Sequence, residues 1–518
     1  MADKLIGAVE AYFTSIRDVH RLGAGTKERS FYPAFAEFLN GIGQDLKPKV
    51  LCLSDLGNTG AGHPDFGLFA AGQVQKGEPR RGQVPERGVI EMKSVAEDAW
   101  FTAASDQVSR YFDAYRLIIV TNMRAFLIVG EGTNGRATRL ESFRLAADSS
   151  AFWDLVSTPR KSAERVGRAF GEFVKRAMTQ SVTLREPKDV AWFLASYARD
   201  ALHRVEAAGD LPALADLRSS LEEVLGVTFE AERGDHFFRS TLVQTLFYGV
   251  FSAWVLWARD AAPSSPKFDW LSAIWHLTVP FIRTLFEQIA SPTHLKPLGV
   301  VEVLDWTAAT LNRVDAPSFF ARFNDADAVQ FFYEPFLEAF DPELRKELGV
   351  WYTPIEVVTY MVARVDRALR EDLGIADGLA SEQVYILDPC CGTGAFLAAV
   401  LRRIDASLME RGFGALRGQM VKKAALSRVL GFEIMPAPFV VAHLQVGLVL
   451  AELGATLDAA SERPGVFLTN ALTGWEPHVN KPLPFPELEQ ERAAADRVKQ
   501  DAPILVILGN PPITGLRA

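Results

Sequence analysis

Cysteine is scarce in this sequence, and an excess of basic charge is absent. The 518 residues include three cysteines, Cys52, Cys390 and Cys391, and two of them are adjacent. So few cysteines exclude a disulfide framework and indicate a reducing compartment. The formal net charge is −9, from 55 Lys and Arg against 64 Asp and Glu. No global positive field is present, so any contact with a polyanion must use local patches.

A secretory signal and a membrane span are also missing. The amino-terminal stretch MADKLIGAVEAYF is amphipathic and lacks the apolar core of a signal peptide. The most apolar stretch, Leu242–Trp257, is short for a span. It also contains polar residues, at Gln244, Thr245 and Ser252. We therefore expect a buried helix there, in a cytoplasmic protein whose length suits roughly two to four domains.

Two common nucleotide-binding motifs are lacking, although one glycine-rich turn is present. Residues Tyr385–Leu397, YILDPCCGTGAFL, predict a strand, a tight turn through Gly392 and Gly394, and a helix. Glycines let a ligand approach the backbone, and the helix start presents free N–H groups. The turn has no GKS or GKT of a P-loop. It also lacks the third glycine of a dehydrogenase, and Glu433 is too distant in sequence to serve as that enzyme's ribose acid.

Strands and helices alternate around this turn. We expect strands that end at Asp388, Glu433, Thr469 and Asn510, with helices between them. A βαβαβαβ series predicts an open parallel sheet, in which ligands bind at the carboxyl ends of the strands. The strand ends are therefore the expected ligand site.

A second set of polar residues lies within residues 1–150, which read as one mixed α/β domain. Asp65 is in HPDFGLF, and Glu91 and Lys93 are in the strand-like VIEMK. Strand side chains alternate, so Glu91 and Lys93 share a face. Asp65 and Glu91 could hold a hard divalent cation such as Mg²⁺ through oxygens. Lys93 could then orient or deprotonate the attacking water.

A helix and a hairpin follow this strand. Gln107 and Tyr111 are four apart on a helix predicted for 106–116, and two apolar runs, 117–121 and 125–129, predict a hairpin. Each pattern alone is short enough to occur by chance. Together they resemble the PD-(D/E)xK nuclease fold, in the version found in RecB-like nucleases. Glu37, on a helix predicted for 30–39, is either a further acid or a solvated surface residue. The candidate catalytic residues are Asp65, Glu91, Lys93, Gln107 and Tyr111, with Asp65 and Glu91 as metal ligands.

Residues 151–345 have a helical pattern without strand-like alternation, which predicts an all-α connector. A basic stretch runs from Arg160 through Lys175 and Arg176 to Arg185. Such a run is usually a solvated helix face, and beside an enzyme that acts on DNA it could contact phosphates.

Residues 346–518 resemble the adenine-specific DNA methyltransferases that use S-adenosylmethionine. The matching motifs are WYTP, DPCCGTGAFL, GFEI, FLTNAL and NPP. A carboxylate can accept two hydroxyl hydrogen bonds, and glycines clear space for the sulfonium arm. The cofactor residues that the resemblance implies are Tyr352, Thr353 and Pro354 at the methionine end, Asp388, Pro389, Gly392 and Gly394 at the amino-acid part, Glu433 at the ribose hydroxyls, and Asn470 near the adenine.

The motif Asn510-Pro511-Pro512 would carry the methyl transfer in this family. The exocyclic amine of a flipped adenine is a poor nucleophile. The Asn510 side-chain oxygen and the Pro511 carbonyl can accept its two hydrogens and aim its lone pair. The prolines, including Pro512, fix the direction of that carbonyl. The family usually has an aromatic residue next, which stacks on the flipped base, whereas this chain has Ile513.

Almost the whole chain resembles single-chain type IIG/IIL and type ISP-like restriction–modification enzymes. Further matching stretches are SFYP, VIEMKS, VTNMRAFLIV, LVQTLFYGVFSA and FYEPFLEAFDPELRKELGV. The resemblance implies a PD-(D/E)xK nuclease-like domain at 1–150 and a helical connector at 151–345. A Rossmann-like class I methyltransferase domain would occupy 346–518. Double-stranded DNA is the implied partner, with Mg²⁺ in the nuclease domain.

The predicted strands are fewer than a complete methyltransferase sheet has, and no target-recognition domain follows NPP. We therefore expect a C-terminally incomplete member, whose remaining strands and recognition domain are on a separate chain or lost. The uncovered sheet edge would be an association hazard. The alternative is a catalytically inactive remnant that binds cofactor, DNA or a partner without methyl transfer.

Overall fold

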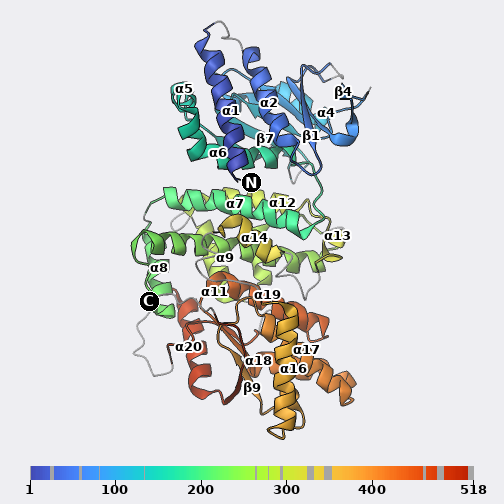
Figure 1. Cartoon of the computed structure of the whole chain (residues 1–518), viewed down its shortest axis with the longest axis vertical. Coiled ribbons are helices and arrows are strands. Elements are labelled where there is room, and N and C mark those ends of the chain that lie inside the picture. Colours follow the sequence, from blue (N-terminus) through green and yellow to red (C-terminus); the bar gives the residue numbers. More distant parts are fainter. Residues whose placement is uncertain are drawn as a thin grey trace. The chain divides into compact units, whose positions relative to one another are not determined.

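The computed structural model describes the chain apart from residues 1, 24–27, 58–60, 77, 81, 133–134, 210, 263–264, 278, 292–295, 324–331, 343–352, 459–461, 475–483 and 512–518. The chain folds as two compact units, residues 1–183 and 184–518 (Figure 1). The first unit extends past residue 150 because α5 (Ser149–Ser157) and α6 (Pro159–Met178) pack against α1 (Ala2–Arg21). The predicted division into three domains at 150 and 345 remains a prediction.

A six-stranded mixed sheet forms the centre of the first unit. Its strand order is β1-β2-β5-β6-β7-β8, in which β5 and β6 are parallel and the other neighbours are antiparallel. The antiparallel pairing of β6 with β7 confirms the predicted hairpin. The strands of this sheet and of a small separate ribbon are β1 (Val50–Ser54), β2 (Phe66–Ala70), β5 (Val89–Met92), β6 (Ile118–Thr121), β7 (Ala125–Glu131) and β8 (Ala137–Arg144), then β3 (Val74–Gln75) and β4 (Glu78–Pro79).

Side chains alternate along β5 between two hydrophobic clusters. Ile90 and Met92 pack in the cluster that contains α1, α2 (Tyr32–Gly43) and α6. Val89 packs in the cluster on the other face, with α3 (Ala99–Ala103) and α4 (Asp106–Tyr115). Because strand side chains alternate, Glu91 shares the face of Val89 and is directed toward α4.

Arg176 corrects the prediction of a solvated basic face along α6. Its side chain is 3% exposed and forms an ion pair of 2.5 Å with Glu141 on β8. Lys175 is also buried, whereas Arg160 at the start of the helix is exposed. The reason is that the carboxyl half of α6 packs into the core around Phe173, and this packing buries its polar neighbours as well.

Helix α9 (Ala231–Asp260) lies in the core of the second unit. Its 30 residues are long and apolar enough, by length and composition, to cross a membrane, but 83% of its apolar window is buried within the fold. Residues such as Leu246 and Val250 are fully buried. This confirms the buried helix predicted at Leu242–Trp257. In the described part of residues 184–345 the other helices are α7 (Pro187–Ala207), α8 (Pro212–Leu225), α10 (Trp270–Ala273), α11 (Pro280–Ala290), α12 (Val300–Leu311), α13 (Ala316–Phe320) and α14 (Glu334–Phe340).

A four-stranded sheet follows in the second unit, with helices around it (Figure 1). Its order is β11-β10-β9-β12, and all neighbouring strands are parallel. This confirms the predicted open parallel sheet, whose strands all end at one edge. The elements are β9 (Tyr385–Asp388), β10 (Val429–Glu433), β11 (Val466–Leu468) and β12 (Ile504–Ile507), with helices α16 (Ile355–Glu371), α17 (Ala395–Glu410), α18 (Arg417–Ser427), α19 (Pro436–Glu452) and α20 (Pro486–Asp501).

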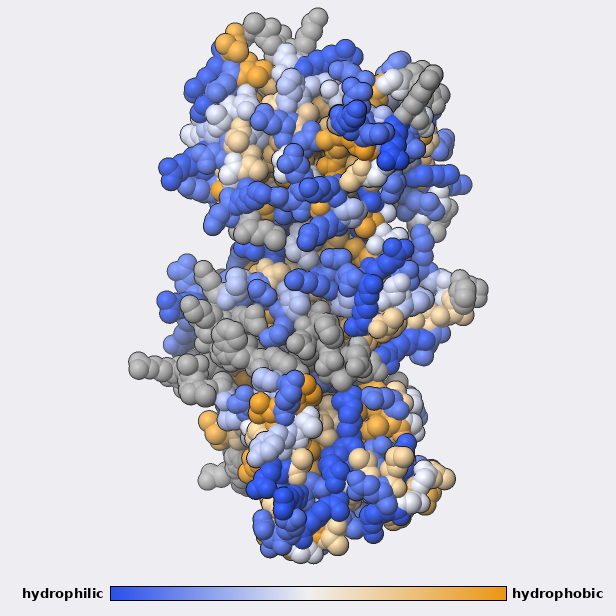
Figure 2. Space-filling model, turned by 45° about the vertical axis from the view of Figure 1, so that its right-hand side comes forward, coloured by the Kyte–Doolittle hydropathy of each residue, from blue (hydrophilic) through white to orange (hydrophobic). Residues whose placement is uncertain are grey.

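Strand β12 is the least covered part of this sheet. Among the described strands it pairs only with β9. Its apolar side chains Leu505 and Ile507 are 48% and 70% exposed, whereas Val506 on the other face is buried. Elsewhere, on the face drawn in Figure 2, hydrophilic residues predominate and hydrophobic ones lie in small groups. Among the described residues, the sheet therefore exposes apolar side chains at its β12 edge.

Candidate functional sites

The first candidate site is built on Glu91, near the end of β5. Its side chain is 3% exposed, and its Oε1 lies 2.6 Å from the ammonium of Lys93. Gln107 Nε2 donates to the same oxygen at 2.9 Å and also reaches the hydroxyl of Tyr111 at 3.0 Å. The four side chains predicted from strand and helix spacing therefore do meet. Strand alternation brings Lys93 to Glu91, and the four-residue helical spacing brings Gln107 to Tyr111.

Asp65, just before β2, lies beside this site, because its carboxylate binds the backbone between Glu91 and Lys93. Its Oδ2 accepts from the backbone N–H of Met92 at 2.8 Å, and its Oδ1 contacts the Tyr32 hydroxyl at 2.5 Å. The same hydroxyl lies 2.8 Å from Glu28 Oε1. A phenol has one proton, so it can donate to only one of the two carboxylates at a time. Tyr32 therefore brings Asp65 and Glu28 to the same point.

The charges in this cluster perturb one another. Burial raises the pKa of Glu91, the hydrogen bond from Lys93 opposes this, and the charges of Asp65 and Glu28 add to the rise. Burial also raises the pKa of Glu28, and the charge of Asp65 adds to it, while the bond from Tyr32 opposes both. Burial acts to lower the pKa of Lys93, but Glu91 and the other two carboxylates raise it overall. Lys93 is therefore a protonated partner of Glu91.

The cluster has the chemistry to accept a cation. Glu91 Oε2 is buried and has no hydrogen-bond partner, so one carboxylate oxygen is left for a ligand. Oxygen ligands of this kind suit Mg²⁺. Within the described residues, however, no group of three or more His, Cys, Asp or Glu side chains is placed to hold a metal ion. The assignment of Asp65 and Glu91 as metal ligands stays a prediction.

Sequence reasoning missed Glu28 and Tyr32. The further acid that the sequence offers is Glu37, on the helix predicted for 30–39, and it is exposed in the structure. The only signal for the other pair was the spacing Glu28-x-x-x-Tyr32, which places both side chains on one side of a helical turn. That spacing is common, and nothing in it indicates that Asp65 lies opposite.

The second candidate site begins where β9 ends at Asp388. This residue is 1% exposed. Its Oδ1 accepts from Cys390 N–H at 3.2 Å, and its Oδ2 is buried without a partner. Burial raises the pKa of Asp388 to about 7, since the Cys390 hydrogen bond lowers it less and the charge of Glu433 raises it further. A buried acid with an unused oxygen is suited to a cationic ligand group.

The glycine turn follows Asp388 and the half-buried Pro389. Gly392 and Gly394 have φ of 54° and 88°, the left-handed region in which glycine is favoured. A Cβ at Gly392 would meet no atom within 4 Å, whereas one at Gly394 would lie 3.3 Å from the Cα of Ala442. Gly394 is the N-cap of α17 and makes no side-chain capping bond. The turn therefore combines open space at Gly392 with a helix start that has no side-chain cap, which suits a ligand cradle.

Glu433, at the end of β10, connects this turn to the neighbouring strand. Its Oε2 accepts from Gly392 N–H and its Oε1 from Met435 N–H, each at 2.8 Å. Burial raises the pKa of Glu433 to about 6, and these backbone hydrogen bonds oppose the rise. Each oxygen has a second lone pair, so the carboxylate can still accept from a ligand's hydroxyls.

Residues after β12 reach the same edge of the sheet. A Cβ at Gly509 would lie 2.3 Å from Asp388 Oδ1, so only glycine allows this approach. Asn510 Nδ2 donates to Thr353 Oγ1 at 3.1 Å, which brings two predicted site residues together. Pro354 and Pro511 are exposed beside them. Tyr352, Pro512 and Ile513 lie outside the described residues.

Asn470, predicted to lie near the cofactor's adenine, follows β11. Its Nδ2 donates to the Leu225 carbonyl at 3.1 Å, and its Oδ1 accepts from Leu472 N–H at 3.0 Å. The side chain therefore shapes the loop after β11, and this loop starts beside Glu433, whose carbonyl accepts from Thr469 N–H at 2.8 Å.

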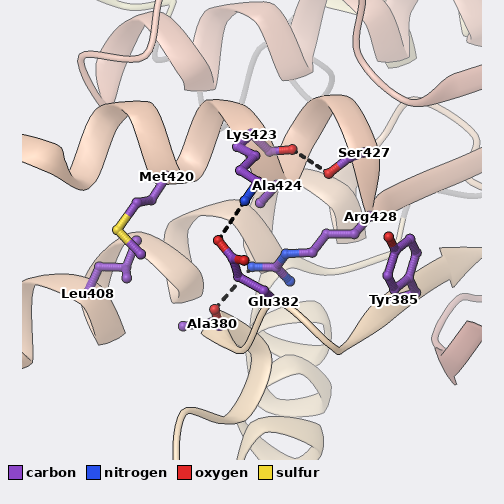
Figure 3. A pocket seen from close by; sticks show the side chains of 9 residues that line it. All are labelled: Ala380, Glu382, Tyr385, Leu408, Met420, Lys423, Ala424, Ser427 and Arg428. Carbon is purple, nitrogen blue, oxygen red and sulfur yellow. Dashed lines mark hydrogen bonds and ion pairs between the residues drawn. The ribbon is translucent and has the colours of Figure 1, made fainter.

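A cavity of about 140 Å³ lies elsewhere in this unit (Figure 3). It is near Tyr385, at the start of β9 and so at the opposite end of the strand from Asp388. Lys423 pairs with Glu382 at 2.8 Å there, and Arg428 donates to backbone carbonyls such as that of Ala380. None of the predicted site residues lines it, so the candidate sites are the two described above.

Substitution Gly509→Ala should weaken a ligand at Asp388. The added methyl would overlap Asp388 Oδ1 at 2.3 Å and must displace the carboxylate or the Asn510 backbone. We expect at least a roughly tenfold loss of S-adenosylmethionine affinity by calorimetry, or ~1.4 kcal/mol. Gly447→Ala is the matched control, because a Cβ there meets nothing within 4 Å. Equal binding by wild type and Gly509→Ala would contradict the assignment of Asp388 to the ligand.

Residues 324–448 match the model of the N-6 DNA Methylase family. The match includes α16, the glycine turn and Glu433, so the chain contains an N-6 DNA methylase region. A search of curated protein sequences finds no match.

Three solved structures illustrate the similarity. The DrdV–DNA complex is 18% identical with a TM-score of 0.43, and the alignment covers 98% of this chain and 44% of that one. A nuclease-deletion mutant of the type ISP restriction–modification enzyme LlaGI with a DNA substrate mimic is 18% identical, with a TM-score of 0.41 and coverage of 71% and 29%. The ATP-dependent type ISP enzyme LlaBIII bound to DNA is 19% identical, with a TM-score of 0.42 and coverage of 71% and 23%. The chain spans less than half the length of each of these proteins.

Proposed function

We propose that the second unit is an adenine-specific DNA methyltransferase region that uses S-adenosylmethionine, within a cytoplasmic restriction–modification or phage-defence protein. One observation carries this proposal. Asp388 Oδ2 is a buried carboxylate oxygen without a partner, and it lies between an open glycine turn and the residues that precede Asn510. An N-6 methylase region needs a cofactor site and an amine-binding site that adjoin, and this edge of the sheet would supply both.

The residues present fit the cofactor. Asp388 would accept from its ammonium group, Glu433 from its ribose hydroxyls, and the turn at Gly392 would leave room for the arm between them. Thr353 and Pro354 would lie at the methionine end. S-adenosylmethionine supplies the methyl group when bound.

Asn510 would hold the target amine. Its Nδ2 is engaged by Thr353 Oγ1 at 3.1 Å, which orients the amide and leaves Oδ1 as the acceptor. Oδ1 and the carbonyl of Pro511 would accept the two amine hydrogens of an adenine turned out of double-stranded DNA. Holding both hydrogens directs the nitrogen lone pair and makes the transfer effectively unimolecular.

We also propose that the first unit is a PD-(D/E)xK-like, metal-dependent DNA endonuclease. The support is the meeting of Asp65, Glu91 and Lys93, together with a buried Glu91 oxygen that has no hydrogen-bond partner among the described residues. Asp65 and Glu91 would hold Mg²⁺, which would activate water when bound. Lys93 would orient that water, because its raised pKa makes it a proton donor in the resting protein. Gln107 and Tyr111 would position Glu91.

A partner polypeptide is part of this proposal. Among the described strands one side of β12 is unpaired, and Leu505 and Ile507 are exposed. That side is suited to a further strand from another segment or a separate chain. The same observation, with Ile513 at the position after NPP, favours a second candidate function. In it the protein binds cofactor, DNA or a partner without transferring a methyl group.

Methyl transfer by the 518-residue chain alone should be slow. Ile513 cannot stack on a flipped base as an aromatic ring does, and such stacking is worth about 1–3 kcal/mol. Incorporation of labelled methyl groups into DNA should therefore be weak, and Ile513→Tyr should raise it roughly five- to a hundredfold. Rapid incorporation by the wild-type chain, without an increase in the variant, would contradict this expectation.

A further inference from the structure

A buried ammonium supports the loop that follows β11. Lys499, near the end of α20, has a side chain that is 1% exposed. Its Nζ donates to Thr469 Oγ1 at 2.7 Å, to the Asn470 carbonyl at 2.9 Å and to the Thr473 carbonyl at 2.7 Å. An ammonium has three protons, so this one loop uses all of them.

Within the part of the chain that the structure describes, Lys499 has no close counter-ion. The carboxylate of Asp496 lies 4.0 Å from Nζ, beyond hydrogen-bonding distance, and the ring of Phe432 lies 5.3 Å away. Burying a charge without a close counter-ion is unfavourable, and burial lowers the pKa of Lys499 accordingly. Three charge-assisted hydrogen bonds offset that cost, and all three go to the loop. The conformation of the loop therefore depends on the position of the ammonium.

The loop, residues 469–474, lies at the ligand edge of the sheet. Thr469 N–H donates to the Glu433 carbonyl at 2.8 Å, which places the loop beside the carboxylate assigned to the ribose. Asn470 holds it from the other side, through the Leu225 carbonyl at 3.1 Å. Gly474, with φ of 77°, makes room for the Asp496 carboxylate and the ammonium, because a Cβ there would lie 2.2 Å from Asp496 Oδ1 and 3.1 Å from Nζ. The group of a ligand that follows its ribose would meet this loop first.

We propose that Lys499 is a positioning residue for the cofactor: its buried ammonium holds the loop 469–474 in the shape that receives the adenine of S-adenosylmethionine. The inference rests on the proposed cofactor site. Lys499 does not touch the cofactor itself. Without the ammonium, the Asn470 and Thr473 carbonyls lose their donor, and the loop must turn them toward water.

Calorimetry on three variants of the full chain tests this inference. Lys499→Met keeps the length of the side chain and removes its charge, so the Kd for S-adenosylmethionine should rise at least tenfold with unchanged stoichiometry. The Kd for 5′-methylthioadenosine, which carries the adenine without the amino acid, should rise in parallel. Thr469→Val removes one of three acceptors and should cause a smaller rise. Lys423→Met is the matched control, since Lys423 is an exposed lysine paired with Glu382, and it should bind as wild type does.

Each outcome distinguishes the inference from the function on which it rests. If wild type fails to bind S-adenosylmethionine, the proposed function fails and the inference with it. If wild type binds and Lys499→Met binds within twofold, or loses stoichiometry at an unchanged Kd, Lys499 is only a structural residue and the inference is wrong. An equal rise in Lys423→Met would also overturn it. If Lys499→Met does not fold, Thr469→Val decides, and an unchanged Kd in that variant contradicts the inference.

Discussion

Lys93→Ala should abolish DNA cleavage while the protein still binds its metal. Lys93 holds Glu91 Oε1 at 2.6 Å, and Glu91 Oε2 has no partner. Removing the ammonium therefore leaves Oε1 with the Gln107 amide at 2.9 Å, and both carboxylate oxygens can still accept a cation. What is lost is the group that we propose orients the attacking water. Positioned proton-transfer groups are worth on the order of 10²–10⁴-fold in rate. A nicking assay on supercoiled plasmid with Mg²⁺, beside calorimetry with Mn²⁺, measures both quantities.

Glu91→Ala should behave differently in the same assay. It removes a hard oxygen ligand, so both metal binding and nicking should be lost. Lys49→Ala, at an exposed lysine just before β1, is the control and should cut as wild type does. Cutting that survives both Glu91→Ala and Lys93→Ala, or persists in excess chelator, would mean that this cluster is not a nuclease site.

Asp388→Asn should stabilise the ligand-free protein at alkaline pH and abolish its affinity for the cofactor. The pKa of Asp388 is raised from 3.8 to about 7 in the folded protein. The folded state therefore holds the proton more tightly than the unfolded state. The stabilisation that comes from this proton is fully present below pH ~4 and is lost as the pH rises toward 7. The reason is that the change of the unfolding free energy with pH follows the difference in protons bound by the unfolded and folded states. A rise in pKa from 3.8 to about 7 corresponds to ~4 kcal/mol of unfolding free energy. This is an upper bound on the stability that the neutral amide can restore at alkaline pH.

Urea unfolding of wild type and Asp388→Asn at pH 4, 6 and 8 measures this effect. The two proteins should be similar at pH 4, and the variant should gain stability over wild type with each step upward. S-adenosylmethionine should stabilise wild type at pH 8 and have little effect on the variant, since the amide cannot pair with the cofactor's ammonium. A stability difference that is independent of pH would show that Asp388 is ionised in the folded protein and that its burial has been misjudged.

Local patterns predicted much of the second site. The apolar run into Asp388, the glycine turn and the helix after it indicate strand, turn and helix by themselves, and alternation of elements indicates a parallel sheet. Parallel strands end at one edge, which is why Asp388, Glu433 and Asn510 could be grouped from sequence alone. In the first site, the alternation of side chains along a single strand placed Glu91 beside Lys93.

Contacts between distant segments could not be predicted in this way. Tyr32 meets Asp65 from 33 positions away, and Lys499 meets Thr469 from 30 positions away. Periodicity shows which face of an element is buried but not which element covers it. For that reason the basic pattern predicts a solvated face that includes Arg176, whereas α6 places this side chain in the core, where it pairs with Glu141. Periodicity likewise does not show that α6 packs on α1, the contact that places residues up to 183 in the first compact unit.

Calorimetric titration of S-adenosylmethionine into wild type and Gly392→Asp tests the central claim most directly. Gly392 has φ of 54° and faces open space, and its N–H is bonded to Glu433. An aspartate there would fill the cradle and add a negative charge next to two carboxylates. The account predicts binding by wild type near one site per chain and no measurable binding by the variant. Equal binding by both proteins would place the cofactor elsewhere and contradict the account.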